Sequence, residues 1–324
     1  MRVTDAAKQG RSQSVIEAVE NGSVTDLQLL LRKVCQDYHT IKKHDGHLEL
    51  VRFLLSVGAK AEVEMVCEAA RGGHEKLINA LVDGGLPSDL FVAAALGDAA
   101  AVQGHLALEA SSVTHFDSQG TTPLHYCCAS SIWRNSSATK HRFLETSSVL
   151  LSAGANVHAT GAYHGLAGVT PLFYVGWTGG HPEIAKQLLE HGAEITQNIS
   201  FAAIGHFQRH GEGNYQVAEA LLAHGFDVNH CEDRTALHAF AGHEDSRGVS
   251  WLLEHGADVD ARDSEGNTPL MAAARRNTGI MVLRLLAEAG SSLSASNHLG
   301  ESALDQAESS GKTKAAAFLR TLSD

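Results

Sequence analysis

The most constraining feature of this chain is a short string that recurs along most of its length. Its clearest copy, residues 251–274, reads WLLEHGADVDARDSEGNTPLMAAA. A Leu-Leu pair closes an apolar helical stripe, and Gly256 follows where a left-handed residue ends a helix at least cost. Thr268 is placed to cap a new helix, and Pro269 suits its first turn, where the N–H has no helical partner. The string therefore predicts a helix end, an extended turn and a helix start, in that order.

Both halves of the string return in a fixed order. The helix end returns as LLSVGAKAE, LLSAGANVH, LLEHGAEIT and LLAHGFDVN, which begin at Leu54, Leu150, Leu188 and Leu221. The helix start returns as TTPLHYCCA, VTPLFYVGW, RTALHAFAG and ESALDQAES, which begin at Thr121, Val169, Arg234 and Glu301. Where nothing is inserted, the copies lie about 33 residues apart. A repeat of this kind is one helix pair that buries its apolar face against its neighbours.

This order of motifs resembles the ankyrin-repeat family, and the resemblance covers nearly all of residues 1–324. It implies an all-α fold, a single ankyrin-repeat solenoid of about ten helix-turn-helix units with short β-hairpin fingers. The composition agrees, because 44% apolar but only 6% aromatic residues suit a long thin core of Leu, Val and Ala. Irregular units with insertions are expected at about residues 121–230.

Three insertions interrupt the repeat in neighbouring units. They read SSIWRNSSATKHRFLETS from Ser130, TGAYHGLAGV from Thr160 and HFQRHGEGNY from His206. Because they would stack side by side, we expect them to form a functional surface. A separate insertion, CQDYHTIKKHDG from Cys35, fits a tolerated loop equally well, since the cost of loop closure rises only slowly with length.

Charge and cysteine usage exclude several classes of protein. A formal charge of −12 disfavours a nucleic-acid partner and favours a basic one. The five cysteines are odd in number and have no CxxC spacing, which indicates reduced thiols and a cytoplasmic protein, with a nuclear location left open. No apolar run approaches the roughly 18 residues of a membrane helix, and no signal-peptide core follows Met1, so no membrane insertion is expected.

The family resemblance implies a partner-binding groove lined by fingers and by the ends of the inner helices. Trp, Tyr and Arg supply most interface energy in general, so the partner is expected to be another protein or peptide that contacts such residues here. Trp133 and Trp177 also fit packing against a neighbouring loop. The predicted contact residues are Arg71, Trp177, His243, Arg275 and Arg276 at helix ends, Trp133, Arg134, His206, Arg209 and His210 in inserted turns, and Phe116, Gln119, Tyr163, His164 and Arg262 in fingers.

Most of the 20 histidines occupy repeat positions rather than a reactive cluster. The resemblance implies a structural hydrogen bond for His125 and His238, which stand in the TPLH-like slot. His206 and His210 could share a helix face, but glycines flank them and the HExxH carboxylate is missing. No nucleophile elbow, phosphate loop or dinucleotide fingerprint occurs. We therefore predict no metal site, no cofactor and no catalytic residue, and favour a protein that is not an enzyme.

Two functions stay open from the sequence. The favoured one is a protein-protein interaction module, acting as a scaffold, adaptor or inhibitor through the concave groove of the solenoid. The alternative is a small-molecule-binding protein or unusual enzyme, with a His/Trp-lined pocket formed by the inserted loops of units five to seven. A deep pocket under those loops would support the alternative, and an open groove would support the favoured reading.

Overall fold

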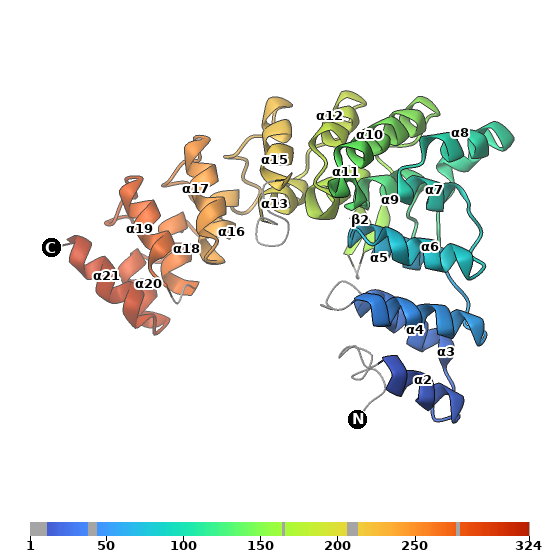
Figure 1. Ribbon diagram of the computed structural model, residues 1–324. Coiled ribbons are helices and arrows are strands. Elements are labelled where there is room, and N and C mark those ends of the chain that lie inside the picture. Colours follow the sequence, from blue (N-terminus) through green and yellow to red (C-terminus); the bar gives the residue numbers. More distant parts are fainter. Residues whose placement is uncertain (1–11, 38–43, 164–165, 206–212, 277–278, 324) are drawn as a thin grey trace. The chain divides into compact units, whose positions relative to one another are not determined.

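The computed structural model describes residues 12–37, 44–163, 166–205, 213–276 and 279–323. The chain divides into two compact units, Met1–Glu194 and Ile195–Asp324 (Figure 1). Each unit is described by itself below.

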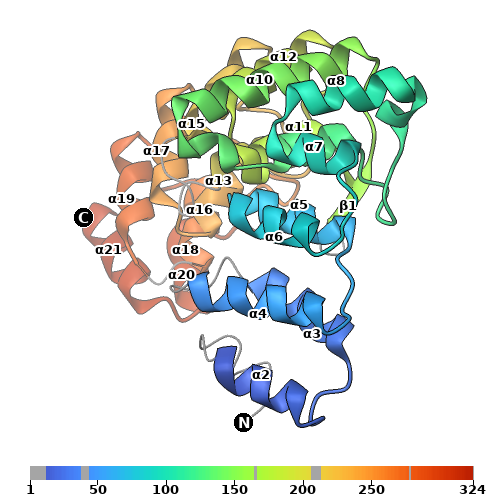
Figure 2. The same cartoon turned by 45° about the vertical axis from the view of Figure 1, so that its right-hand side comes forward.

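In the first unit, short inner helices alternate with outer helices (Figure 2). Inner helices pack on inner helices from α3 to α11, and outer helices pack on outer helices from α2 to α6 and from α8 to α12. The inner helices are α3 (Leu27–Asp37), α5 (Val63–Arg71), α7 (Leu90–Leu96), α9 (Pro123–Ala129) and α11 (Pro171–Tyr174). The outer helices are α2 (Ser12–Glu20), α4 (His44–Ser56), α6 (Glu75–Asp83), α8 (Ala99–Leu108), α10 (Ser137–Ser152) and α12 (Pro182–Glu190).

The second unit repeats this arrangement. Its inner helices α16, α18 and α20 pack in series, and each packs on the outer helix that follows it. The inner helices are α13 (Gln197–Gly205), α16 (Ala236–Gly242), α18 (Pro269–Arg276) and α20 (Ala303–Ser309). The outer helices are α15 (Gly213–Ala223), α17 (Ser246–Glu254), α19 (Met281–Glu288) and α21 (Thr313–Ser323).

These helices form five complete pairs in the first unit and four in the second, and α2 is the outer helix of one further pair. If that pair is counted as the first, α9 and α10 form the fifth pair, α11 and α12 the sixth, α18 and α19 the ninth, and α20 and α21 the tenth. The inner helix predicted before α2, near Asp5, lies outside the described residues. The prediction of an all-α ankyrin-repeat solenoid of about ten helix pairs is therefore confirmed.

The core is a thin layer of small and aliphatic side chains between inner and outer helices. Val92, Ala93, Ala94 and Ala95 of α7 are almost fully buried, and alanine at such positions lets neighbouring helices approach closely. Four of the five free cysteines, Cys35, Cys67, Cys127 and Cys128, are also buried in the first unit, whereas Cys231 of the second unit is exposed. Burial raises the pKa of the Cys67 and Cys127 thiols to about 12, so both stay protonated.

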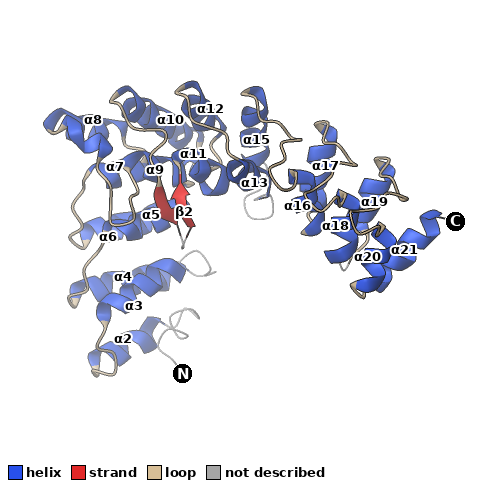
Figure 3. Cartoon of the chain, turned by 180° about the vertical axis from the view of Figure 1, so that it is seen from behind, coloured by secondary structure: helices blue, strands red, loops and turns tan. Residues whose placement is uncertain are grey.

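The fingers are tight turns built by one polar side chain. In three of them an Asp or Asn side-chain oxygen accepts hydrogen bonds from the backbone N–H groups two and four residues later, at 2.7 to 3.0 Å. The residue three positions after that Asp or Asn is a left-handed glycine. These fingers start at Asp117, Asp263 and Asn297. Within the described ranges only the lengthened finger of the sixth pair has strands, β1 (Gly161–Tyr163) and β2 (Leu166–Val169), which pair antiparallel (Figure 3).

The predicted structural role of His125 and His238 is confirmed. Nδ1 of His125 lies 2.8 Å from the Thr122 hydroxyl, and its Nε2 lies 3.0 Å from the Val169 carbonyl oxygen in the next finger. His238 repeats both contacts with Thr235 and Asn267. Each ring therefore ties one repeat to the next. In the ninth pair Met271 occupies the equivalent position.

The buried rings make stability depend on pH. Burial lowers the pKa of His125 to about 4, below its unfolded value of about 6.5. The unfolded state therefore binds the proton first, and the stabilisation is complete above about pH 6.5 and is lost as the pH falls toward 4. We expect His125 to contribute a loss on the order of 1–2 kcal/mol of unfolding free energy between pH 7 and pH 5.

Urea unfolding of wild type and His125→Met at both pH values measures this contribution. Methionine is the natural residue at this position in the ninth pair, and it cannot be protonated. The difference between the two pH values should shrink in the variant. An equal pH-dependent loss in both proteins would show that His125 is not the group that titrates.

Candidate functional site

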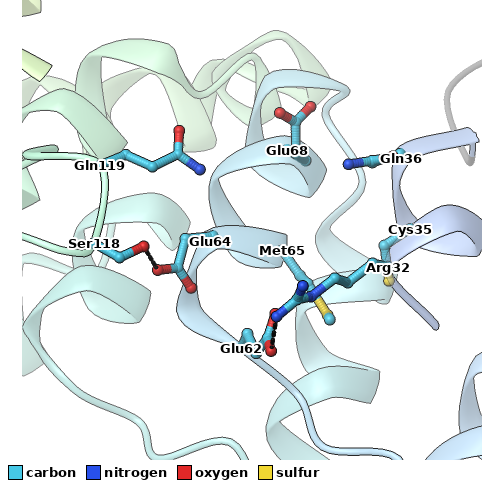
Figure 4. Close-up of a pocket in the computed structure, with 9 residues that line it drawn as sticks. All are labelled: Arg32, Cys35, Gln36, Glu62, Glu64, Met65, Glu68, Ser118 and Gln119. Carbon is cyan, nitrogen blue, oxygen red and sulfur yellow. Dashed lines mark hydrogen bonds and ion pairs between the residues drawn. The ribbon is translucent and has the colours of Figure 1, made fainter. Parts of the chain in front are cut away.

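A pocket of about 460 Å³ lies between helices α3 and α5 and the finger of the fifth pair (Figure 4). Helix α3 contributes Arg32, Cys35 and Gln36, and the finger contributes Ser118 and Gln119. The third wall is the start of α5 and the residue before it. It presents Glu62, Glu64, Met65 and Glu68.

One of the three carboxylates is neutralised inside the pocket. Arg32 donates through Nε and Nη2 to the two carboxylate oxygens of Glu62, at 2.7 and 2.6 Å. This hydrogen bond is the main cause that lowers the pKa of Glu62, and it raises the pKa of Arg32. Gln28 donates to the same carboxylate at 2.9 Å. The pair fixes the edge of the pocket.

The other two carboxylates leave the pocket with an excess of negative charge. Glu68 pairs with Arg71 at 2.7 Å. Glu64 accepts a hydrogen bond from the Ser118 hydroxyl at 2.5 Å, and no ion pair joins it to any other described residue. Figure 4 shows Glu64 facing Ser118. Met65 and Cys35 also line the pocket, and both are nearly fully buried. The pocket thus combines an apolar floor with an acidic wall.

Two of the predicted contact residues belong to this region. Gln119 lines the pocket, and Arg71 holds Glu68 at its wall. Phe116, in the same finger, is 71% exposed and borders a separate cavity of about 370 Å³ with Thr114 and Thr122. The prediction missed Arg32, which lies inside α3 rather than at a helix end, in an inserted turn or in a finger. It also missed the three glutamates, because it favoured Trp, Tyr and Arg. The available sequence clue was Glu64 and Glu68, two acidic residues within an inner helix, whereas the inner helices α7, α9, α16 and α18 contain no Asp or Glu.

The first insertion runs across the ends of several inner helices. Ser131 donates through its backbone N–H to the Ala70 carbonyl at 2.9 Å and through its hydroxyl to the Arg71 carbonyl at 2.6 Å. The Ser130 hydroxyl donates to the Ala95 carbonyl at 3.0 Å. Arg142, in α10, donates to the Leu96 carbonyl at 2.6 Å. These donors satisfy carbonyl groups that the helix ends leave without partners. We call residues 130–136, including the 3₁₀ turn η3 (Ile132–Asn135), the strap.

Trp133 and Arg134, two predicted contact residues, lie in this strap. The Trp133 indole donates to the Gly179 carbonyl at 2.7 Å, and its ring packs on His181 with centroids 4.6 Å apart. The Arg134 guanidinium carbon lies 5.1 Å from the centroid of the Trp133 ring. Both side chains are half-buried.

Trp177 lies in a π-helical turn, η4 (Val175–Gly179), that continues α11. The sixth pair has one residue more between Thr170 and the left-handed Gly180 than the tenth pair has between Ser302 and Gly311. A π turn absorbs one extra residue without ending the helix. It places Trp177 parallel to Phe173, with ring centroids 5.8 Å apart.

The predicted residues of the second unit are mostly exposed. His243, Arg275 and Arg276 are solvent-exposed at the ends of α16 and α18. The Arg262 guanidinium donates to the Gly266 and Ser296 carbonyls at 2.7 Å each, and so links two fingers. The remaining predictions fall where the structure describes no side chain: Tyr163, whose backbone alone is described, and His164, His206, Arg209 and His210.

The stacked helix pairs, with side chains held at the helix ends and fingers, define a repeat protein. Comparison with known families gives the class: "Ankyrin repeats (3 copies)" matches residues 209–297 and 245–322, and "Ankyrin repeat" matches residues 119–162. The chain belongs to the ankyrin-repeat family. It is accordingly a protein-interaction module. No helix in the described ranges has the length and apolar character that a membrane crossing needs.

Two solved structures share this fold. The human ASB11 ankyrin repeat domain is 28% identical, covers 72% of this chain and 98% of its own, and has a TM-score of 0.52. The ankyrin repeat domain of Bcl-3, a member of the IkappaB protein family, is 22% identical with the same coverage and a TM-score of 0.53, which supports the fold alone.

Two curated relatives match in sequence. Protein glp-1 of Caenorhabditis elegans is 30% identical over 149 residues, which span 43% of this chain and 11% of the relative. The B-cell lymphoma 3 protein homolog of Mus musculus is 28% identical over 225 residues, which span 64% of this chain and 45% of the relative. The chain therefore spans less than half the length of either relative.

The π turn provides a test of this packing. A Cβ atom on Gly179 would lie 2.0 Å from the Cys128 carbonyl oxygen, so Gly179→Ala must force backbone apart. We expect it to lower the unfolding free energy by about 1–3 kcal/mol or more. Gly104→Ala in α8 is the matched control, because no atom lies within 4 Å of its Cβ position, and it should stabilise by roughly 0.5–1 kcal/mol. Urea unfolding measures both, and equal effects would contradict the close approach.

Proposed function

We propose that this chain binds a partner protein through the inner face of its first unit, with a Lys or Arg side chain of the partner in the acidic pocket. The observation that carries the proposal is the pocket itself, in which Arg32 pairs with Glu62 and Arg71 pairs with Glu68, while Glu64 has no cation among the described residues. A scaffold, adaptor or inhibitor could each act through such a surface. The acidic character of the whole chain, with a formal charge of −12, would also attract a basic partner before contact.

The chemistry of the pocket suits a long basic side chain. The aliphatic stem of Lys or Arg can pack on apolar surface while its charged head reaches a carboxylate. Here Met65 and Cys35 offer the apolar floor, and Glu64 has no cation of its own among the described residues. A charge-assisted hydrogen bond to Glu64 is among the stronger contacts that an interface can form. Gln119 and Gln36 can bind backbone groups of the same segment.

The surface around the pocket is already ordered before a partner arrives. Arg32 is held by Glu62, Arg71 by Glu68, and Ser118 by Glu64. Binding would therefore cost little ordering of these side chains. Phe116, on the same finger, belongs to the proposal as a further contact. Arg275 and Arg276 are proposed as exposed contact residues of the second unit by itself.

A cytoplasmic location, with a nuclear one left open, is part of the same proposal, supported by five cysteines that form no disulfide. The alternative of a small-molecule pocket beneath the inserted loops depends on residues 164–165 and 206–212, which lie outside the described residues. Trp133, which would line such a pocket, makes its polar contact with Gly179 instead.

Site-specific photo-crosslinking tests which face binds. A photoreactive residue at Gln119, in the pocket, should capture a partner protein from cells that express the chain, and one at Asn79, exposed on the outer helix α6, should not. Capture from Asn79 with none from Gln119 would place the interface on the outer helices and contradict the proposal.

Charge reversal tests the pocket once that partner is purified. Glu64→Lys places a cation against the incoming basic side chain, and we expect binding to weaken about tenfold or more. Glu49→Lys, exposed on the outer helix α4, makes the same change in net charge and should alter the dissociation constant less than about twofold. Equal losses in both variants would show that only overall charge matters.

A further inference from the structure

The Arg134 guanidinium is half-buried, and no counter-charge lies on it within the described ranges. Its Nη2 atom is inaccessible to solvent and has no hydrogen-bond partner in the part of the chain that the structure describes. No carboxylate among the described residues pairs with it, and its one described neighbour of note is the Trp133 ring. Burial lowers the pKa of Arg134, although a guanidinium stays charged at any physiological pH. Arg32 and Arg142, by contrast, each donate to acceptors in the protein.

The helix ends beneath the strap do not explain this charge. Carbonyl ends of helices attract cations, but the nearby carbonyls already have donors. Ser131 occupies those of Ala70 and Arg71. Arg142 and Ser130 occupy those at the end of α7. An apolar side chain such as methionine at position 134 would avoid the cost of desolvating a cation and leaving its N–H groups unpaired.

The position of this cation is also fixed. Trp133, on which Arg134 lies, is held by its indole bond to Gly179 and by its contact with His181. The Thr139 hydroxyl donates to the Trp133 carbonyl at 3.0 Å, and the Arg134 N–H donates to the Ser131 carbonyl at 3.1 Å. A cation on a fixed ring and backbone, with no partner among the described residues, is prepared for a ligand from outside the chain.

We infer that Arg134, supported by Trp133, binds a carboxylate of an Asp or Glu side chain in the partner protein. A carboxylate can accept charge-assisted hydrogen bonds from guanidinium N–H groups of Arg134 other than the covered Nη2, and the indole face shields the pair from water. This inference rests on the proposed function and extends it. The partner would then carry an acidic residue for the strap in addition to the basic residue for the pocket.

The probe for this site is a pair of short peptides that differ in one charge. Acetyl-Ala-Glu-Ala-amide and acetyl-Ala-Gln-Ala-amide are titrated into the full chain at constant ionic strength, and the indole N–H signals are followed by NMR. The Trp133 signal, assigned with Trp133→Phe, should shift saturably with the Glu peptide and not with the Gln peptide. Trp251, whose indole donates to Glu219 in the second unit, is the internal control and should not shift.

Substitutions of the cation identify the binding group. Arg134→Met should weaken the Glu peptide about tenfold or more, and Arg134→Lys should restore only part of the affinity, because lysine lacks the planar fork. Arg52→Met removes the same charge from the exposed surface of α4 and should leave the titration unchanged. No shift in wild type, an equal shift in Arg134→Met, or saturation by inorganic phosphate without any response to the Glu peptide would each overturn the inference.

Stability gives a second, independent measurement. If Arg134 is kept for a ligand, Arg134→Met should leave the urea midpoint unchanged or raise it, since it removes a desolvated and unpaired charge. A lowered midpoint would show that the guanidinium holds the strap, and the inference would fail. Neither measurement uses the pocket. The shift of the Trp133 signal with the Glu peptide should persist in Glu64→Lys. A failure of the Arg134 inference can therefore be distinguished from a failure of the proposed basic-residue pocket.

Discussion

The carbonyl groups at the ends of the short inner helices are the constraint on which this structure depends. Helices such as α7 and α9 have seven residues, so most of their carbonyls fall in the last four positions, which find no partner within the helix. Within the described ranges, the inner helices α5, α7, α11 with η4, and α20 meet this need with a turn and a left-handed glycine, as at Gly97 and Gly180. The first unit adds donors from elsewhere in the sequence: Ser130, Ser131, Trp133 and Arg142. The strap is therefore part of the architecture. Its Arg134 side chain is not used for these carbonyl groups, so it is the part of the strap that can bind a partner.

Local sequence patterns were enough to predict the repeats and the histidine hydrogen bonds of each TPLH-like motif. The TPLH-like strings carry Thr, Pro and His at fixed spacing, and both His125 and His238 make the contacts that the spacing implies. The course of the strap could not be read this way, because Ser131 bonds to Arg71, a residue 60 positions earlier that no local pattern connects to it. The sequence also shows the extra residue before Gly180, but not that a π turn, rather than a loop, would absorb it. Packing decides that choice, through the close approach of Gly179 to Cys128.

The candidate site was predicted in part for the same reason. Gln119 was expected on a finger and lines the pocket, since finger tips follow directly from the repeat. Glu64 and Glu68 were overlooked because their meaning depends on which helix faces them, and α3 supplies that context through Arg32 and Cys35. Trp133 was predicted to contact a partner or to pack against a neighbouring loop, and its ring contacts both His181 and Arg134. An aromatic residue in an insertion thus indicates a rigid loop as readily as an exposed contact, and only the neighbours distinguish the two.

Because the cysteines differ in burial between the two units, their rates of modification would report the local unfolding of the first unit. Cys35, Cys67, Cys127 and Cys128 are sealed in the first unit, while Cys231 is freely reachable in the second. A thiol reagent would therefore modify Cys231 at once, and it would modify the other four cysteines only as fast as the first unit unfolds locally. Oxidants would meet the same barrier, because a buried, protonated thiol reacts slowly. The half that carries the pocket and the strap is in this way shielded from chemical damage for as long as it stays folded.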